Sequence, residues 1–318
     1  MWGNSRGWVL SAMMALVLGW LLVLGALPPK PSEPSGAFPN LLAKVQLPTD
    51  PKSVVPLMSE ECDAGEVYGR VLQEYKANRA TYEKYRAKPT EAKAANPRAV
   101  ELLHEAKKCS RMSLFSRRPQ ELLNYNPDLP EMEALEKIGG LANQLGLLYR
   151  LDKKPDEARR QFEAMFALGY HLYRERLSWA EFVAGVNLMA DAARGLAKLE
   201  KDAGNEDRAR TLEEFAKSSD DYKLKQFEVY KVVSSIDTTT VGRHGGDILA
   251  LARHSPEPMW RGEAILSLGR MKFNTPHKGD QAAARREVKQ WVQDPHAAVR
   301  TAAVEADNLT LDKYRTLR

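Results

Sequence analysis

The sequence is poor in the residues from which metal and redox centres are built. Its 318 residues include two cysteines and six histidines. It contains no C-x-x-C pair and no G-x-x-x-x-G-K phosphate loop. These absences exclude the common cysteine-based metal and redox motifs and P-loop nucleotide binding.

Two short matches to catalytic motifs are incomplete. Gly3–Gly7 spells G-x-S-x-G, but that motif works only on a tight turn between a strand and a helix. His104-Glu105 begins H-E-x-x-H, but Lys108 stands where the second histidine belongs. We therefore expect no catalytic residue, cofactor or metal ligand, and a protein that is not an enzyme.

One metal-dependent alternative stays open. His244, Asp247 and His254 could be three metal ligands of a membrane-bound enzyme, with Gly245-Gly246 allowing a tight bend. A polar loop followed by a helix end explains the same residues without a metal.

The charge is basic but dispersed. The net charge is +5 and the pI is near 9.0, with 28% charged and 43% hydrophobic residues, as in an ordinary folded protein. No block of like charge stands out, so the basicity indicates a solvated surface and no nucleic-acid partner.

The longest apolar run lies near the N-terminus. Residues 8–27 carry no charge over 20 residues, enough to cross a bilayer as a helix. Arg6 precedes the run and Lys30 is the first charge after it, so the positive-inside rule puts residues 1–7 in the cytoplasm and the bulk outside. The alternative is a cleaved signal peptide and a secreted protein. Small residues on one face could pair two such helices in a homo-oligomer: Ser11, Ala15 and Gly19.

Residues 28–58 are predicted to form an extended linker. They hold eight of the 18 prolines and few large apolar residues. Such a tether would hold the folded part away from the membrane.

Residues 59–130 are expected to form a helical hairpin region. Tyr68, Tyr75 and Tyr82 recur every seven residues, which predicts a seam along one long helix that ends before Pro89. Pro97 opens the next helix. The tyrosines are interpreted as a packed face, with a ligand platform as the other reading.

Cys62 and Cys109 could form one disulfide outside the cytoplasm. In a simple hairpin they lie about 26 residues before and about 12 after the turn, a mismatch of roughly 20 Å against a limit of ~7 Å. A bridge would need the chain to bend back near Gly65 or Gly69, and the question stays open.

Residues 131–235 carry helical pairs. Leu145-Gly146-x2-Tyr149 is followed by Ala158-x3-Phe162, with Pro155 suited to a helix start. This resembles a tetratricopeptide repeat at 141–170, although Ala142 replaces the tryptophan and Tyr170 the closing proline. A weaker copy covers 178–217, and a further helix with Leu224, Phe227 and Tyr230 follows it.

Residues 242–318 contain a second internal repeat. The stretch from Ser255 aligns without a gap on the stretch from Asp294, at an offset of 39 residues. This is similar to HEAT repeats over about 242–308, whose arginines pair with carbonyls or carboxylates. Arg261 and Arg300 are therefore expected to be structural.

These patterns predict an all-α protein: a single transmembrane helix followed by a solenoid of TPR-like and then HEAT-like helical pairs. Such stacks expose a surface for peptides or protein elements. The expected function is a membrane-anchored adaptor or scaffold with a protein or peptide partner; a non-catalytic regulatory subunit of an envelope complex is another reading. Tyr149 and Tyr173 are the candidate partner-binding residues, with core packing as the alternative.

Overall fold

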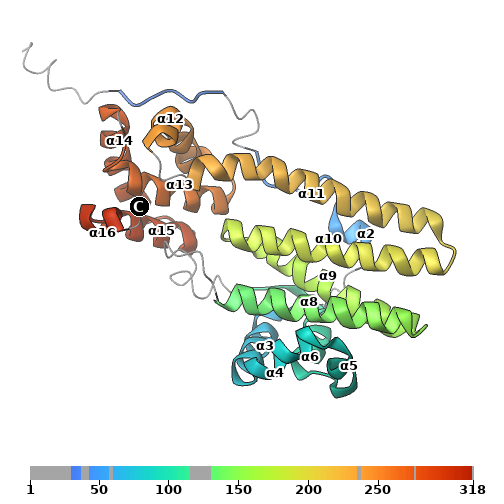
Figure 1. The fold of residues 1–318 in the computed structure, drawn as a ribbon. Helices are drawn as coiled ribbons and strands as arrows, with labels where there is room; N and C mark the ends of the chain where they lie inside the picture. The colour runs from blue at the N-terminus through green and yellow to red at the C-terminus, as the bar shows by residue number, and fades with distance from the viewer. Residues whose placement is uncertain are drawn as a thin grey trace, which may run out of the picture.

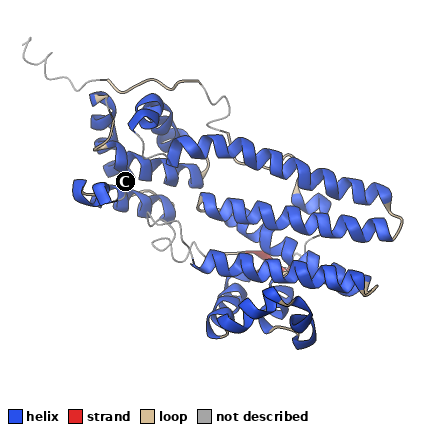
Figure 2. Cartoon of the chain, viewed as in Figure 1, coloured by secondary structure: helices blue, strands red, loops and turns tan. Residues whose placement is uncertain are grey.

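Helices account for most of the chain. The computed structural model describes residues 30–36, 43–56, 60–114, 130–234, 238–275 and 277–316, and within these ranges the protein is mostly α-helical (Figures 1 and 2). No helix in these ranges is both long and apolar enough to cross a membrane. The predicted span 8–27, with Ser11, Ala15 and Gly19, lies outside the described residues.

Four long helices form the centre of the molecule, and each packs on the one before it (Figure 1). They are α8 (Pro130–Leu151), α9 (Pro155–Glu175), α10 (Trp179–Asp202) and α11 (Glu206–Ser234). Short connections fold each helix back, and Gly204 in one of them has φ +77°. The Phe162 ring lies against Gly146, where a Cβ atom would come 2.7 Å from it, and against Gly195. Missing side chains on two helices thus make room for one buried aromatic ring.

The further helix expected around Leu224, Phe227 and Tyr230 is not separate. These residues belong to α11, which runs unbroken for 29 residues. Its far half is held by an aromatic cluster. The Trp179 ring stacks on Tyr230 at 4.8 Å and on Trp260 at 5.6 Å between centroids. Because Trp260 belongs to α13 (Pro258–Met271), this cluster joins the central helices to the C-terminal ones.

The prediction of one long helix before Pro89 is wrong. The chain forms β1 (Glu60–Asp63), α3 (Ala64–Ala77) and α4 (Arg79–Ala87), with a break at Asn78, whose φ and ψ are −121° and 28°. The next elements are α5 (Pro89–Ala95), α6 (Arg98–Ala106) and β2 (Cys109–Arg111). The tyrosine seam is packed, since Tyr68, Tyr75 and Tyr82 are all buried.

A disulfide joins Cys62 to Cys109, with a Cα–Cα distance of 4.7 Å. The long, simple hairpin that argued against this disulfide does not form. Instead, the short helices α3 and α6 pack together, and each cysteine lies next to one of them on the paired parallel strands β1 and β2. The length mismatch therefore disappears.

A buried histidine ties these strands to the central helices. His171 on α9 lies 2.8 Å from the Tyr68 hydroxyl through Nδ1 and 2.8 Å from the Cys109 carbonyl through Nε2. A carbonyl can only accept, so Nε2 carries the proton and Nδ1 accepts from Tyr68. Burial lowers the pKa of His171 to about 4, so the ring is neutral at pH 7.

The C-terminal part is a stack of shorter helices. They are α12 (Thr238–His254), α13, α14 (Lys278–Trp291), α15 (Ala297–Asn308) and α16 (Leu311–Thr316). The break expected at 238–242 is helical, and the non-helical residue is His244. Arg261 pairs with Asp294, and Arg300 donates to the Asp294 carbonyl at 2.6 Å and the Pro295 carbonyl at 2.7 Å. The structural contacts expected of both arginines are present.

Candidate functional site

The described parts of the linker lie on the folded protein, so the prediction of a free tether is wrong for them. Within residues 43–56, Val45 and Leu47 are buried whereas Lys44 and Gln46 are exposed. This alternation is typical of an extended chain with one face against a surface. Residues 43–47 therefore lie along the surface of the folded protein, and we call the surface that contacts them the segment groove.

The segment groove accepts three consecutive backbone amides of this extended chain. The Leu47 amide donates to the Tyr173 hydroxyl at 3.1 Å, and the Gln46 amide donates to the Tyr222 hydroxyl at 3.0 Å. The Val45 amide donates to Oε2 of Glu257 at 3.3 Å. The acceptors come from α9, α11 and the N-cap of α13, so the groove spans the central and C-terminal helices.

Arg176, the C-cap of α9, completes the groove. Its Nη2 atom donates to the Val45 carbonyl at 3.1 Å and to Oε2 of Glu257 at 3.1 Å. Its guanidinium also lies 4.9 Å from the centre of the Tyr173 ring. Because Glu257 is buried, this pairing compensates its charge.

The polar contacts of the segment groove are made with the backbone of the segment and not with its side chains. Phenol oxygens and a carboxylate accept amides, while a guanidinium donates to a carbonyl, which suits any extended peptide. Burial raises the pKa of Tyr222, so its hydroxyl stays protonated and neutral. The Val45 and Leu47 side chains supply the apolar contact.

The two candidate tyrosines lie in different surroundings. Tyr173 is in the segment groove, buried and bonded to the chain's own segment. Tyr149 is half-buried near the end of α8, with the Lys93 ammonium 5.1 Å from its ring centre. No local motif in the sequence marks Arg176, Tyr222 and Glu257 as site residues, because they belong to α9, α11 and α13 or their caps, far apart in the chain.

A second linker stretch, residues 30–36, crosses α14 and α12 as an extended chain (Figure 1). Ser32 donates its amide to Oδ1 of Asp280 at 2.7 Å and its hydroxyl to Oδ2 at 2.8 Å. Ser35 repeats this on Asp247, at 2.9 and 2.7 Å. A signal for this contact was present in the sequence as the His-x-Gly-Asp pattern, which occurs at 244–247 and 277–280.

The same contacts bear on the metal alternative. The Asp247 carboxylate is bonded to Ser35 and to Nδ1 of His244, the latter at 3.1 Å, and His254 is exposed. Across the described part of the chain, no group of three His, Cys, Asp or Glu side chains is placed to hold a metal ion. The arrangement offers Asp247 as a hydrogen-bond acceptor.

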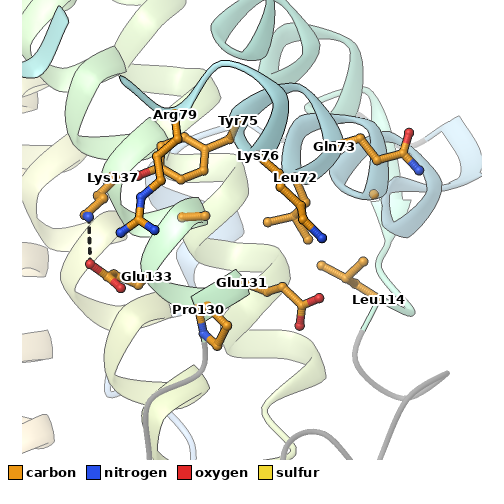
Figure 3. Close-up of a pocket in the computed structure, with 12 residues that line it drawn as sticks. Leu72, Gln73, Tyr75, Lys76, Arg79, Leu114, Pro130, Glu131, Glu133 and Lys137 are labelled. Carbon is orange, nitrogen blue, oxygen red and sulfur yellow. Dashed lines mark ion pairs between the residues drawn. The ribbon is translucent and has the colours of Figure 1, made fainter. Parts of the chain in front are cut away.

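A separate hollow of about 480 Å³ lies between α3 and the start of α8 (Figure 3). Lys137 on its wall lies 2.6 Å from Glu133 and 2.8 Å from Glu83. Hydrogen bonds from Lys137 and Tyr75 lower the pKa of Glu83 to about 2. Both apolar and charged side chains line this hollow: Leu72, Leu114, Pro130, Ala134, Lys76, Arg79 and Glu131.

No protein-family model matches the chain, and neither the curated proteins nor the solved structures gave a significant match.

Proposed function

We propose that this protein is a membrane-anchored helical-repeat scaffold that binds extended protein segments on the non-cytoplasmic side of a membrane. In this proposal residues 8–27 are the anchor, residues 141–170 and, more weakly, 178–217 are TPR-like pairs, and residues from about 242 to 308 are HEAT-like. The protein acts by binding and not by catalysis.

The segment groove is the observation that carries the proposal. The backbone amides of Val45–Leu47 donate hydrogen bonds to side chains of α9, α11 and the N-cap of α13. A surface that satisfies consecutive amides of an extended chain is equipped to bind a partner in the same way. The Cys62–Cys109 disulfide supports a location outside the cytoplasm, where such bonds persist.

Because the linker is docked, the folded part of the protein is expected to lie closer to the membrane than a free tether would place it. Lys30 already lies on α14, where its carbonyl carbon would be 2.6 Å from a Cβ atom at Gly279. In the proposed arrangement only residues 28 and 29 separate the anchor from this contact. The end of the fold formed by α12 and α14 would therefore face the bilayer.

Crosslinked affinity capture of the full-length, membrane-embedded chain tests the proposal. A Val45→Asn/Leu47→Asn variant empties the apolar side of the groove, while a Lys44→Asn/Gln46→Asn variant alters the exposed side of the same segment. We expect a partner whose yield rises several-fold in the first variant and is unchanged in the second. A chain lacking residues 131–318 should capture none of it. Recovery of the same proteins from every chain would refute the proposal.

A further inference from the structure

The start of α14 and the restart of α12 share the His-x-Gly-Asp pattern, with the aspartate at the same position of each helix. His277 is the N-cap of α14, and His244 is the non-helical residue at which α12 restarts. Asp280 and Asp247 therefore both stand at the third helical position, 33 residues apart. Each histidine reaches its aspartate through Nδ1, at 3.5 Å for His277 and 3.1 Å for His244.

Each aspartate holds one serine by two hydrogen bonds. The backbone amide reaches one carboxylate oxygen and the hydroxyl the other, for Ser32 on Asp280 and for Ser35 on Asp247. The two carboxylates are 0% and 2% exposed. A buried carboxylate needs such donors, and hydrogen bonds to an ionised acceptor are the stronger kind.

The glycine of each pattern lets the segment backbone approach. A Cβ atom on Gly246 would come 2.7 Å from the Ser32 carbonyl oxygen and closer still to that of Glu33. A Cβ atom on Gly279 would collide with the Lys30 carbonyl group. Any other residue at these two positions would push the segment away from the aspartates.

The spacing of the two serines matches the spacing of the two helices. Polyproline II has three residues per turn and rises about 3.1 Å per residue, so its residues i and i+3 share a face about 9 Å apart. Helices α12 and α14 are in contact, and helices that pack together typically have axes roughly 8–10 Å apart. Pro31 and Pro34 fix their own φ angles and restrict the preceding residues to extended conformations.

We propose that the two His-x-Gly-Asp helix starts form a recognition site for serines three residues apart in a polyproline-II segment, and that residues 31–36 of the same chain are its resident ligand. The site takes the pattern Pro-Ser-x-Pro-Ser with unmodified hydroxyls. A phosphoserine is rejected because its charge would face a buried carboxylate. This rests on the proposed binding function, but it concerns helices other than those of Tyr173 and Tyr222, so either can fail alone.

Hydrogen exchange of the full chain, followed by mass spectrometry, tests the resident ligand. The amides of Ser32 and Ser35 are read directly, because each donates to a carboxylate. A Gly246→Ala/Gly279→Ala variant keeps both aspartates and favours the helices, yet expels the segment. We expect these amides to exchange roughly tenfold or more faster, with α13 unchanged.

The matched control is Gly69→Ala/Gly140→Ala, because a Cβ atom at either helical position meets nothing within 4 Å. It should leave exchange at residues 30–36 unchanged. Equal exchange of the Ser32 and Ser35 amides in wild type and the Gly246→Ala/Gly279→Ala variant would overturn the assignment. If the wild-type protein were a dimer that became monomeric in that variant, the segment would bind the neighbouring copy of the chain. That result would overturn binding within one chain.

Recognition of the pattern is tested with a full-length Ser32→Ala/Ser35→Ala chain, which lacks the resident hydroxyls. A fluorescent peptide KPSEPSG should bind this chain, as measured by anisotropy. Peptides KPAEPAG, KPSEAPSG and doubly phosphorylated KPSEPSG should bind roughly tenfold or more weakly. Asp247→Asn/Asp280→Asn in the same chain should weaken KPSEPSG binding. Equal binding of all four peptides, or no binding of KPSEPSG, would refute the recognition rule.

Discussion

We predict that the buried His171 makes the protein less stable in acid. Its folded-state pKa is lowered to about 4 from the ordinary value of 6.5, with burial as the largest cause. Between these values the unfolded chain binds a proton that the folded chain does not, so stability is complete above about pH 6.5 and falls as the pH drops towards 4. Differential protonation costs about 2 kcal/mol at pH 5 and about 3 kcal/mol at pH 4.

Protonation would also reverse the direction of a hydrogen bond. Nδ1 accepts from the Tyr68 hydroxyl, and once protonated it could only donate. His171→Gln keeps a neutral donor and acceptor but does not titrate. At pH 8 we expect the variant to be less stable by about 1–3 kcal/mol, because it repacks a buried site. In acid the difference from wild type should shrink or reverse.

Urea unfolding of the full chain, followed by circular dichroism from about pH 4 to pH 8, measures both stabilities. The comparison between the two chains isolates His171, because His104, whose pKa is lowered to about 3 chiefly by burial, contributes equally to both. Parallel pH dependence of wild type and His171→Gln would refute the argument. It would mean that the ring is not a neutral hydrogen-bond acceptor in the folded state.

Three further predictions concern stability. Reduction of the disulfide, or Cys62→Ser/Cys109→Ser, opens a link between residues 47 apart and should cost about 4 kcal/mol on the chain-entropy model, read as a lower thermal midpoint; an unchanged midpoint would contradict it. Gly146→Ala should destabilise the protein because its Cβ would meet Phe162, whereas Gly140→Ala, with open space, should stabilise it by about 0.5–1 kcal/mol; the same sign for both would be inconsistent with the packing. Trp260→Ala should cost about 3–5 kcal/mol by thermal unfolding, since this side chain is 1% exposed and stacks on Trp179; a loss under about 1 kcal/mol would argue against that stack.

Local periodicity predicts the all-α class and the stripes of the central helices well. The apolar positions of α8 recur at helical spacing and its buried face follows that spacing, whereas residues 164–173 of α9 are buried on every side of the helix. Interruptions were harder to place. Asn78 ends α3 without a proline or glycine, whereas α11 continues through the stretch expected to hold two helices. At both places tertiary contacts, and not the local sequence, determine whether the helix ends or continues.

The candidate site was predictable only in part. Tyr173 was expected to be a partner-binding or core residue, but its acceptor role depends on a segment 126 residues earlier in the chain. The Pro-Ser-rich linker has the composition of a free spacer. Its docking depends on pairs such as Ser32 and Asp280, and no rule of composition connects such distant residues.

The contact between Ser32 and Asp280 joins residues 248 positions apart, which sets an order of events during synthesis. At about 5–20 residues per second, roughly 12–50 s pass between the emergence of the serine and that of its aspartate. The central helices can fold in that interval, but the linker cannot settle on α12 and α14. A nascent or truncated chain that ends before α12 would therefore carry this segment undocked and open to proteases.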